Sequence, residues 1–160
     1  MKTKQEKTNV MRVLDQAKIA YEPLFYSIIE EDFSGTAVAN LLGIDPEQCF
    51  KTLSTISSDE KILIFTIPVN ATLDLKKAAE AAHVKKIQML HVKDLKSIIG
   101  YERGSVSPIG MKKKFPVFID ETATLFDDIE LSGGAKGASI RISPQLLADF
   151  LTASFADITE

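Results

Sequence analysis

Two apolar segments joined by a short polar turn constrain this chain more than any other feature. Residues 49–57 (CFKTLSTIS) and 62–69 (ILIFTIPV) are rich in β-branched and aromatic residues, and the polar sequence SSDEK connects them. Such a composition favours strands, and a connection of this length favours an antiparallel hairpin. We therefore predict an antiparallel pair of strands over these residues.

One lysine is unexpected in the first of these strands. Side chains alternate between the two faces of a strand, so Lys51 shares a face with Cys49 and Leu53. An ammonium group is rarely buried without a partner. Lys51 therefore lies either at an exposed edge or beside a polar cavity that uses its charge.

Helices and strands are interleaved along the rest of the chain. Apolar residues at helical spacing with capping residues predict helices, and β-branched runs predict strands. Several strand pairs have connections of hairpin length, which favours a mixed sheet with antiparallel pairs in an α+β fold. Helices are expected at residues 8–18, 34–43, 72–83, 92–100 and 143–151, and further strands at 21–28, 85–90, 117–120, 128–134 and 137–142.

Size and charge limit the classes of protein that this chain can represent. Its 160 residues, 45% hydrophobic and 26% charged, predict a single globular domain over residues 1–160. No run of about 18 apolar residues or secretory signal is found, so we expect a cytoplasmic protein that spans no membrane. The net charge of −3 argues against a protein that grips long duplex nucleic acid.

Metal and cysteine chemistry receive little support. Two histidines and one cysteine, widely separated, match no zinc spacing, and we expect no metal and no cofactor. Cys49 acting as a nucleophile with His83 or His91 would need a base within hydrogen-bonding reach. A single strand cysteine is more often a small core residue, and we expect that role for Cys49.

Three polar segments each admit two interpretations. The sequence SGGAKGAS at 132–139 is a glycine turn between strands or a phosphate-binding loop, although it lacks the Walker pattern. The KKK run at 112–114 is solvated surface or a contact for a phosphate backbone. The sequence GYERGSVSPIG at 100–110 is a structural loop or one that presents backbone groups to a ligand.

Five segments, taken in order, resemble one family, the YbaK/EbsC-like aminoacyl-tRNA trans-editing proteins. This family is related to the editing domain inserted in bacterial prolyl-tRNA synthetases. The resemblance implies a curled, barrel-like mixed β-sheet flanked by helices. The segments are KTNVMRVLDQAKIAYE, GIDPEQCFKTL, LDLKKAAEAAHVKKIQML, GYERGSVSPIGMKKKFPVFID and LSGGAKGASIRISPQLLADFL.

The resemblance also implies a set of site residues. Lys51 and Gly104 would be catalytic, and the residues expected to bind substrate are Tyr26, Thr52, Ser105, Ser132 and Gly133. The chain departs from the family in two places. Ser105 stands where many relatives have a second glycine, and the turn SGGAKG, with Lys136, replaces the commoner SGGKRG. Ser105 could narrow the pocket or change its selectivity, and the sequence leaves open whether Lys136 replaces the missing basic residue.

The implied activity is deacylation of mischarged Cys-tRNA(Pro) at the 3′ CCA end, with prolyl-tRNA synthetase as a candidate partner. No metal and no enzyme nucleophile would be needed, because the thiol of the substrate attacks its own ester. One alternative is a deacylase for alanyl, seryl or threonyl esters that uses a bound water. Another is a non-catalytic regulatory or binding module, although no helix-turn-helix signature supports DNA binding.

Overall fold

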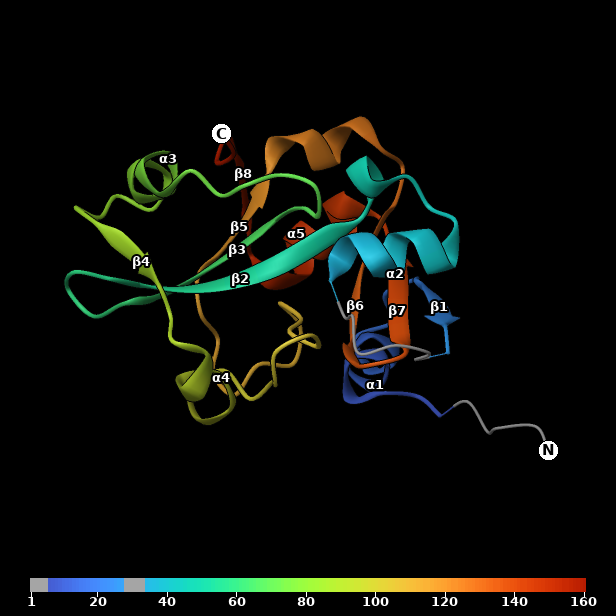
Figure 1. Cartoon of the computed structure of the whole chain (residues 1–160). Helices are drawn as coiled ribbons and strands as arrows, with labels where there is room; N and C mark the ends of the chain where they lie inside the picture. Colours follow the sequence, from blue (N-terminus) through green and yellow to red (C-terminus); the bar gives the residue numbers. More distant parts are fainter. Residues whose placement is uncertain (1–5, 28–33) are drawn as a thin grey trace.

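Eight strands form two sheets in the part of the chain that the computed structural model describes, residues 6–27 and 34–160. Figure 1 shows the arrangement, in which one sheet has the order β1-β7-β6 and the other β4-β2-β3-β5-β8. The predicted α+β fold with a mixed sheet is confirmed by the larger sheet, whereas the smaller sheet is antiparallel, and the sheets do not close into the expected barrel. The strands are β1 (Glu22–Phe25), β2 (Phe50–Ser57), β3 (Ile62–Pro68), β4 (Ile87–Met89), β5 (Val117–Asp120), β6 (Ile129–Ala135), β7 (Ala138–Ile142) and β8 (Ser154–Ala156).

The predicted hairpin forms the middle of the larger sheet. β2 and β3 pair antiparallel from Phe50 opposite Pro68 to Ile56 opposite Ile62. β3 then pairs with β5, and β5 with β8, both in parallel. The sequence did not predict β8, because Ser154–Ala156 contains a single large apolar residue and is held as a strand by its pairing with β5.

The smaller sheet is built on a second hairpin, as the glycine-rich sequence at 132–139 predicted. β6 and β7 pair antiparallel, with a register shift between Ser132 and Ala135, and β1 lies along the other side of β7. An isolated parallel bridge between Cys49 and Glu130 joins this sheet to the start of β2. Nearby, the Gln48 side-chain amide donates to the Asp128 carbonyl over 2.9 Å, which adds a polar link between the sheets.

Helix caps agree with the sequence. The side chains of Thr8, Ser34 and Ser143 each accept a backbone N–H in the first turn of a helix, and Gly43 ends its helix with a left-handed φ of 69°. A 3₁₀ turn at Glu121–Leu125 was not predicted. The helices are α1 (Asn9–Gln16), α2 (Gly35–Leu42), α3 (Leu75–Ala81), α4 (Val92–Ile98) and α5 (Pro144–Leu151).

The larger sheet is buried on both faces at β3. Ile64 belongs to the main core together with residues of α1 and α5, whereas Phe65 and Ile67 pack in a second cluster with Ala78 of α3. This explains why the sequence of β3 is almost continuously apolar. No helix of the described residues is long and apolar enough to cross a membrane.

Two glycines with positive φ allow the packing at the β6 turn to be tested. A Cβ at Gly134 would lie 2.7 Å from Cγ2 of Val10, whereas a Cβ at Gly43 would meet nothing within 4 Å. We expect Gly43→Ala to lower the free energy of unfolding by about 1 kcal/mol, from backbone strain alone. Gly134→Ala should lower it by a further ~1–3 kcal/mol, because Val10 must move. Urea denaturation measures the free energy of unfolding of both variants. An equal decrease in the two would show that the contact with Val10 does not affect stability.

Candidate active site

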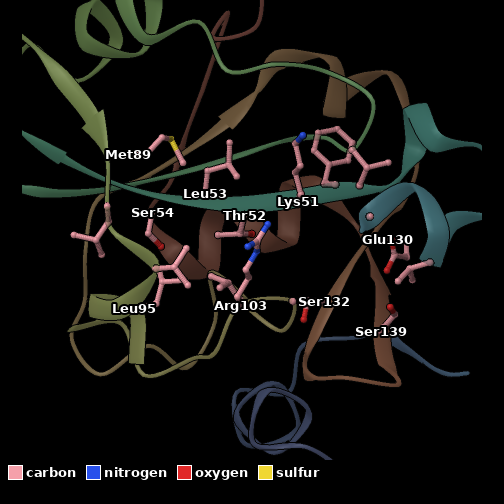
Figure 2. A pocket seen from close by; sticks show the side chains of 18 of the residues that line it. Lys51, Thr52, Leu53, Ser54, Met89, Leu95, Arg103, Glu130, Ser132 and Ser139 are labelled. Carbon is pink, nitrogen blue, oxygen red and sulfur yellow. The ribbon is translucent and has the colours of Figure 1, made fainter. Parts of the chain in front are cut away.

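A cavity of about 440 Å³ opens between the two sheets. Its walls come from β2, from α2, from the segment that joins β4 to α4, from the glycine-rich loop at 100–110 and from the β6–β7 hairpin. Figure 2 shows β2 crossing this cavity, with side chains directed to both sides of the strand. Five separate segments of the chain therefore line one cavity.

The cavity lies along an unpaired edge of β2. β3 pairs with β2 over its whole length, but β4 pairs only with Thr55, Ile56 and Ser57. Just beyond β4, the Leu90 N–H also donates to the Ser54 carbonyl over 3.0 Å. Among the described residues, Lys51, Thr52 and Leu53 therefore have β3 on one side and the cavity on the other. An unpaired strand edge presents backbone donors and acceptors to whatever binds beside it.

Register shows which backbone groups face the cavity. The Val69 N–H donates to the Cys49 carbonyl over 2.8 Å, and the Ser57 N–H donates to the Lys61 carbonyl over 2.9 Å. Positions bonded to the partner strand alternate in an antiparallel pair, so odd-numbered residues of β2 bond to β3. The N–H and C=O of Thr52 consequently point away from β3, toward the cavity.

Lys51 lines the cavity, and its side chain is half-buried. Burial lowers the pKa of its ammonium group. No described residue forms a hydrogen bond or an ion pair with Lys51 Nζ. Figure 2 shows Lys51 on one side of the β2 ribbon and Thr52 and Ser54 on the other. The positive charge is therefore available to a ligand.

Two hydroxyl groups lie on the opposite side of β2 from Lys51. Thr52 Oγ1 and Thr66 Oγ1 of the neighbouring strand are 3.2 Å apart and share a hydrogen bond. Ser54 is only 5% exposed, and no partner for its Oγ is found among the described residues. Buried polar atoms in proteins are nearly always paired, so Ser54 Oγ is a candidate for contact with a bound molecule or water.

Ser132 fastens the glycine-rich loop to β6. Its Oγ donates to the Ser105 carbonyl over 3.1 Å and accepts the Gly134 N–H over 3.1 Å. Ser105 Oγ donates to the Glu102 carbonyl over 3.0 Å. Gly104, with a φ of 91°, is thereby held in the cavity wall in a conformation that favours glycine.

The structure brings most of the predicted site residues together. The predicted residues that line the cavity are Tyr26, Lys51, Thr52, Gly104 and Ser132. Ser105 and Gly133 lie outside the lining, and so does Lys136. The Ser105 hydroxyl turns back to its own loop, and a Cβ at Gly133 would meet the backbone of Ala138 at 3.1 Å. The side chain of Ser105 therefore does not narrow the cavity.

Two charged residues of the cavity were missed by the sequence analysis. Arg103 precedes Gly104 in the loop, is exposed, and has no ion-pair partner in the described part of the chain. Glu130 of β6 is only 4% exposed. A signal for Glu130 was available, because it is a charged residue between Ile129 and Leu131 in an apolar strand, as Lys51 is in β2.

Glu130 is a buried carboxyl whose two side-chain hydrogen-bond donors are neutral, although Arg141, which pairs with Asp128, lies opposite it on β7. Burial raises its pKa, while hydrogen bonds from the side chains of Ser139 and Cys49 act in the opposite direction. The same surroundings affect two other groups. Burial, reinforced by Glu130, raises the pKa of the Cys49 thiol, and burial raises the pKa of Tyr26. Cys49 therefore remains a thiol in the core rather than a nucleophile.

The lysine run at 112–114 lies outside the candidate active site. Lys112, Lys113 and Lys114 border a separate cavity of about 310 Å³, and Lys112 Nζ donates to the Ser97 carbonyl over 3.1 Å. Over the described ranges, no group of three or more His, Cys, Asp or Glu side chains is placed to hold a metal ion.

The unpaired hydroxyl of Ser54 yields the first prediction from this site. A buried hydroxyl without a partner costs about 1–3 kcal/mol. Ser54→Ala removes that group with little change in shape, so we expect the free energy of unfolding to stay equal or to rise by ~1 kcal/mol. Thr55→Ala is the matched control, because Thr55 Oγ1 donates to the Leu63 carbonyl over 2.7 Å and its loss should destabilise. Urea denaturation compares the two, and a clear loss in Ser54→Ala would mean that Ser54 Oγ has a partner in solution.

The raised pKa of Glu130 predicts how stability depends on pH. The folded state holds the Glu130 proton at pH values where the unfolded state has released it, so this residue makes stability fall as pH rises from its ordinary value of 4.5. Glu130→Gln removes that contribution. We expect its melting temperature to exceed that of the unmodified protein near pH 8 and the difference to shrink toward pH 4. Thermal denaturation monitored by circular dichroism tests this, and a constant difference across the range would contradict it.

Comparison with known proteins identifies the family. The model of the aminoacyl-tRNA editing domain matches residues 33–150. A protein of Enterococcus faecalis (strain ATCC 700802 / V583), described as "Putative Cys-tRNA(Pro)/Cys-tRNA(Cys) deacylase EbsC", is 41% identical over 158 residues, which cover 99% of this chain and 96% of that protein. The uncharacterised protein YwhH of Bacillus subtilis (strain 168) is 23% identical over 112 residues, which cover 70% of this chain and 71% of YwhH.

A solved structure has the same fold. It is described as "a putative trans-editing enzyme for prolyl tRNA synthetase" and superposes with a TM-score of 0.83 at 20% identity, covering 94% of each chain. At that identity the likeness concerns the fold. The family match and the Enterococcus relative, which extends over almost the whole chain, go further: this chain belongs to the aminoacyl-tRNA editing domain family.

Proposed function

We propose that this protein removes wrongly attached amino acids from tRNA in trans, with cysteine on tRNA(Pro) as the substrate. The observation that carries the proposal is the cavity along the open edge of β2, which combines the ammonium group of Lys51, unpaired among the described residues, with the backbone of Thr52 and Gly104. The family match and the relative described as a deacylase support the same activity.

The charges in the cavity suit the 3′ end of an aminoacylated tRNA. The CCA end carries phosphates, and the ester carbonyl develops negative charge when it is attacked. Lys51 supplies positive charge inside the cavity, and Arg103 supplies it in the exposed loop. A donor aimed at developing negative charge contributes about 2.7–4 kcal/mol to stabilisation of the transition state. Contact limited to the end of the tRNA is compatible with the net charge of −3.

The backbone of the cavity offers further donors. The Thr52 N–H points toward the cavity from β2, and Gly104 lets the loop approach a ligand without a side chain between them. Backbone donors on a paired strand are fixed before the substrate arrives, so little reorganisation is needed in the transition state. Tyr26 and Ser132, which also line the cavity, would orient the amino acid.

With a cysteinyl ester the substrate can supply its own nucleophile. The sulfur attacks the ester carbonyl, a carbon–sulfur bond forms, and the bond from the carbonyl carbon to the ribose oxygen breaks. The thiol proton ends on that ribose oxygen, which leaves free tRNA and a cyclic thiolactone. Holding the thiol and the carbonyl in reactive geometry can contribute up to ~7–11 kcal/mol. Cys49 takes no part, because its thiol is buried in the core.

The experiment that tests the proposal follows the loss of radiolabelled amino acid from Cys-tRNA(Pro) and Ala-tRNA(Pro). We expect the protein to release cysteine and Lys51→Ala to reduce kcat/KM by about 10²–10³-fold, the effect of losing one donor to the transition state. Lys61→Ala is the matched control, because Lys61 lies in the β2–β3 turn, pairs with Asp59 over 3.3 Å and does not line the cavity. Full activity in Lys51→Ala would remove Lys51 from the mechanism.

The same assay distinguishes the proposed function from the two alternatives, a deacylase for another amino acid and a non-catalytic binding module. Release of alanine with retention of cysteine would mean a deacylase that uses a bound water and prefers a different amino acid. Retention of both esters, with seryl and threonyl esters also intact, would favour a non-catalytic binding module. Addition of prolyl-tRNA synthetase to the assay tests the proposed partnership, which should raise the rate on tRNA(Pro) if the two proteins act together.

A further inference from the structure

Glu130 takes no part in the proposed bond cleavage, yet its carboxyl group lines the cavity. We infer that Glu130 binds the α-ammonium group of the substrate amino acid, so that the cavity accepts esters with a free amino group and rejects N-acylated ones. The inference rests on the proposed function and adds a determinant of specificity to it.

The burial of Glu130 requires an explanation. A carboxylate that is 4% exposed is costly to keep in a fold unless charge pairing or hydrogen bonding compensates for the lost water. Within the described part of the chain, no ion pair to Glu130 is found. Replacement by an apolar residue of similar size would therefore be expected to stabilise the protein. A group that is retained in the wall of a cavity at such a cost is a candidate for ligand binding.

The surroundings of Glu130 leave room for a cation. Its protein donors are the hydroxyl of Ser139 and the thiol of Cys49, which are neutral. An ionised carboxylate has about four acceptor positions, so these two donors do not saturate it. An ammonium group from a ligand would supply both the missing hydrogen bonds and the missing charge, and such charge-assisted bonds are stronger than neutral ones.

The distribution of charge in the cavity sets the direction of the substrate. Figure 2 shows Glu130 and Ser139 toward one end, Arg103 near the middle, and Ser54, Met89 and Leu95 toward the other end. An ammonium group is repelled by Lys51 and Arg103 and attracted by Glu130, whereas phosphates are attracted by the cations. An aminoacyl ester therefore enters with its amino group toward β6 and its phosphates toward the loop at 100–110.

Selection against blocked amino groups follows from this contact. An N-acylated amino acid has a neutral amide in place of the ammonium group, so it leaves the buried carboxylate without a charged partner. A site built to bind a polar group can reject an analogue that lacks it by several orders of magnitude. We expect the free ester to be preferred by at least about 10²-fold over its N-acetyl counterpart.

The test compares two esters, the aminoacyl-tRNA that the unmodified protein cleaves fastest and its N-acetylated form. The unmodified protein should show the preference, Glu130→Gln should reduce it to less than about tenfold, and Glu130→Asp should retain most of it because the charge remains. Glu121→Gln, at an exposed position outside the cavity, is the control and should keep the full preference. Equal cleavage of the two esters by the unmodified protein, or an unchanged preference in Glu130→Gln, would overturn the inference.

A binding measurement keeps this inference separate from the proposed activity. A stable amide analogue of 3′-aminoacyl-adenosine and its N-acetyl derivative are titrated by calorimetry against the unmodified protein and Glu130→Gln. A preference for the free amine that Glu130→Gln abolishes supports the inference even if no ester is cleaved, a result that would overturn the proposed deacylation alone. Equal affinity of the unmodified protein for the two analogues would overturn the role of Glu130 while leaving deacylation intact.

Discussion

The one-sided pairing of β2 is the constraint on which the candidate site depends. β3 covers one edge of β2 along its whole length, but among the described residues Leu90 and β4 cover the other edge only from Ser54 onward. The smaller sheet meets β2 just before this gap, at the bridge between Cys49 and Glu130. The first half of β2 is thus rigid and buried at one edge and open at the other, which combines fixed backbone geometry with access for a ligand.

Stability and ligand binding make opposite demands on this cavity. Lys51 loses hydration, Glu130 is buried beside neutral donors, and neither Lys51 Nζ nor Ser54 Oγ has a partner among the described residues. Each of these features costs folding free energy. Elsewhere four of the five described helices have a side-chain N-cap and the core strands are apolar, so most of these unfavourable features lie where a substrate would bind.

Much of the fold could be predicted because its signals are local. The capping residues Thr8, Ser34 and Ser143 and the glycine at position 43 marked the helix ends within a few residues. The hairpin of β2 and β3 followed from two apolar runs and a short turn. The predicted site was incomplete, because it lacked the charged residues Arg103 and Glu130. Lys51 and Glu130 are each a charged residue within an apolar strand, so the signal that marked Lys51 was also present for Glu130, the second charge in the cavity.

The sequence by itself determined the helices, most strands, the two hairpins and the charged positions within them, because capping, periodicity and turn chemistry act over a few residues. Only the tertiary structure decided that the sheets stay open, that β8 pairs with β5, that Ser105 turns away from the cavity, and that Arg103 and Glu130 face the same space as Lys51. These outcomes depend on pairing and packing between segments far apart along the chain, and no local pattern of residues encodes that free energy.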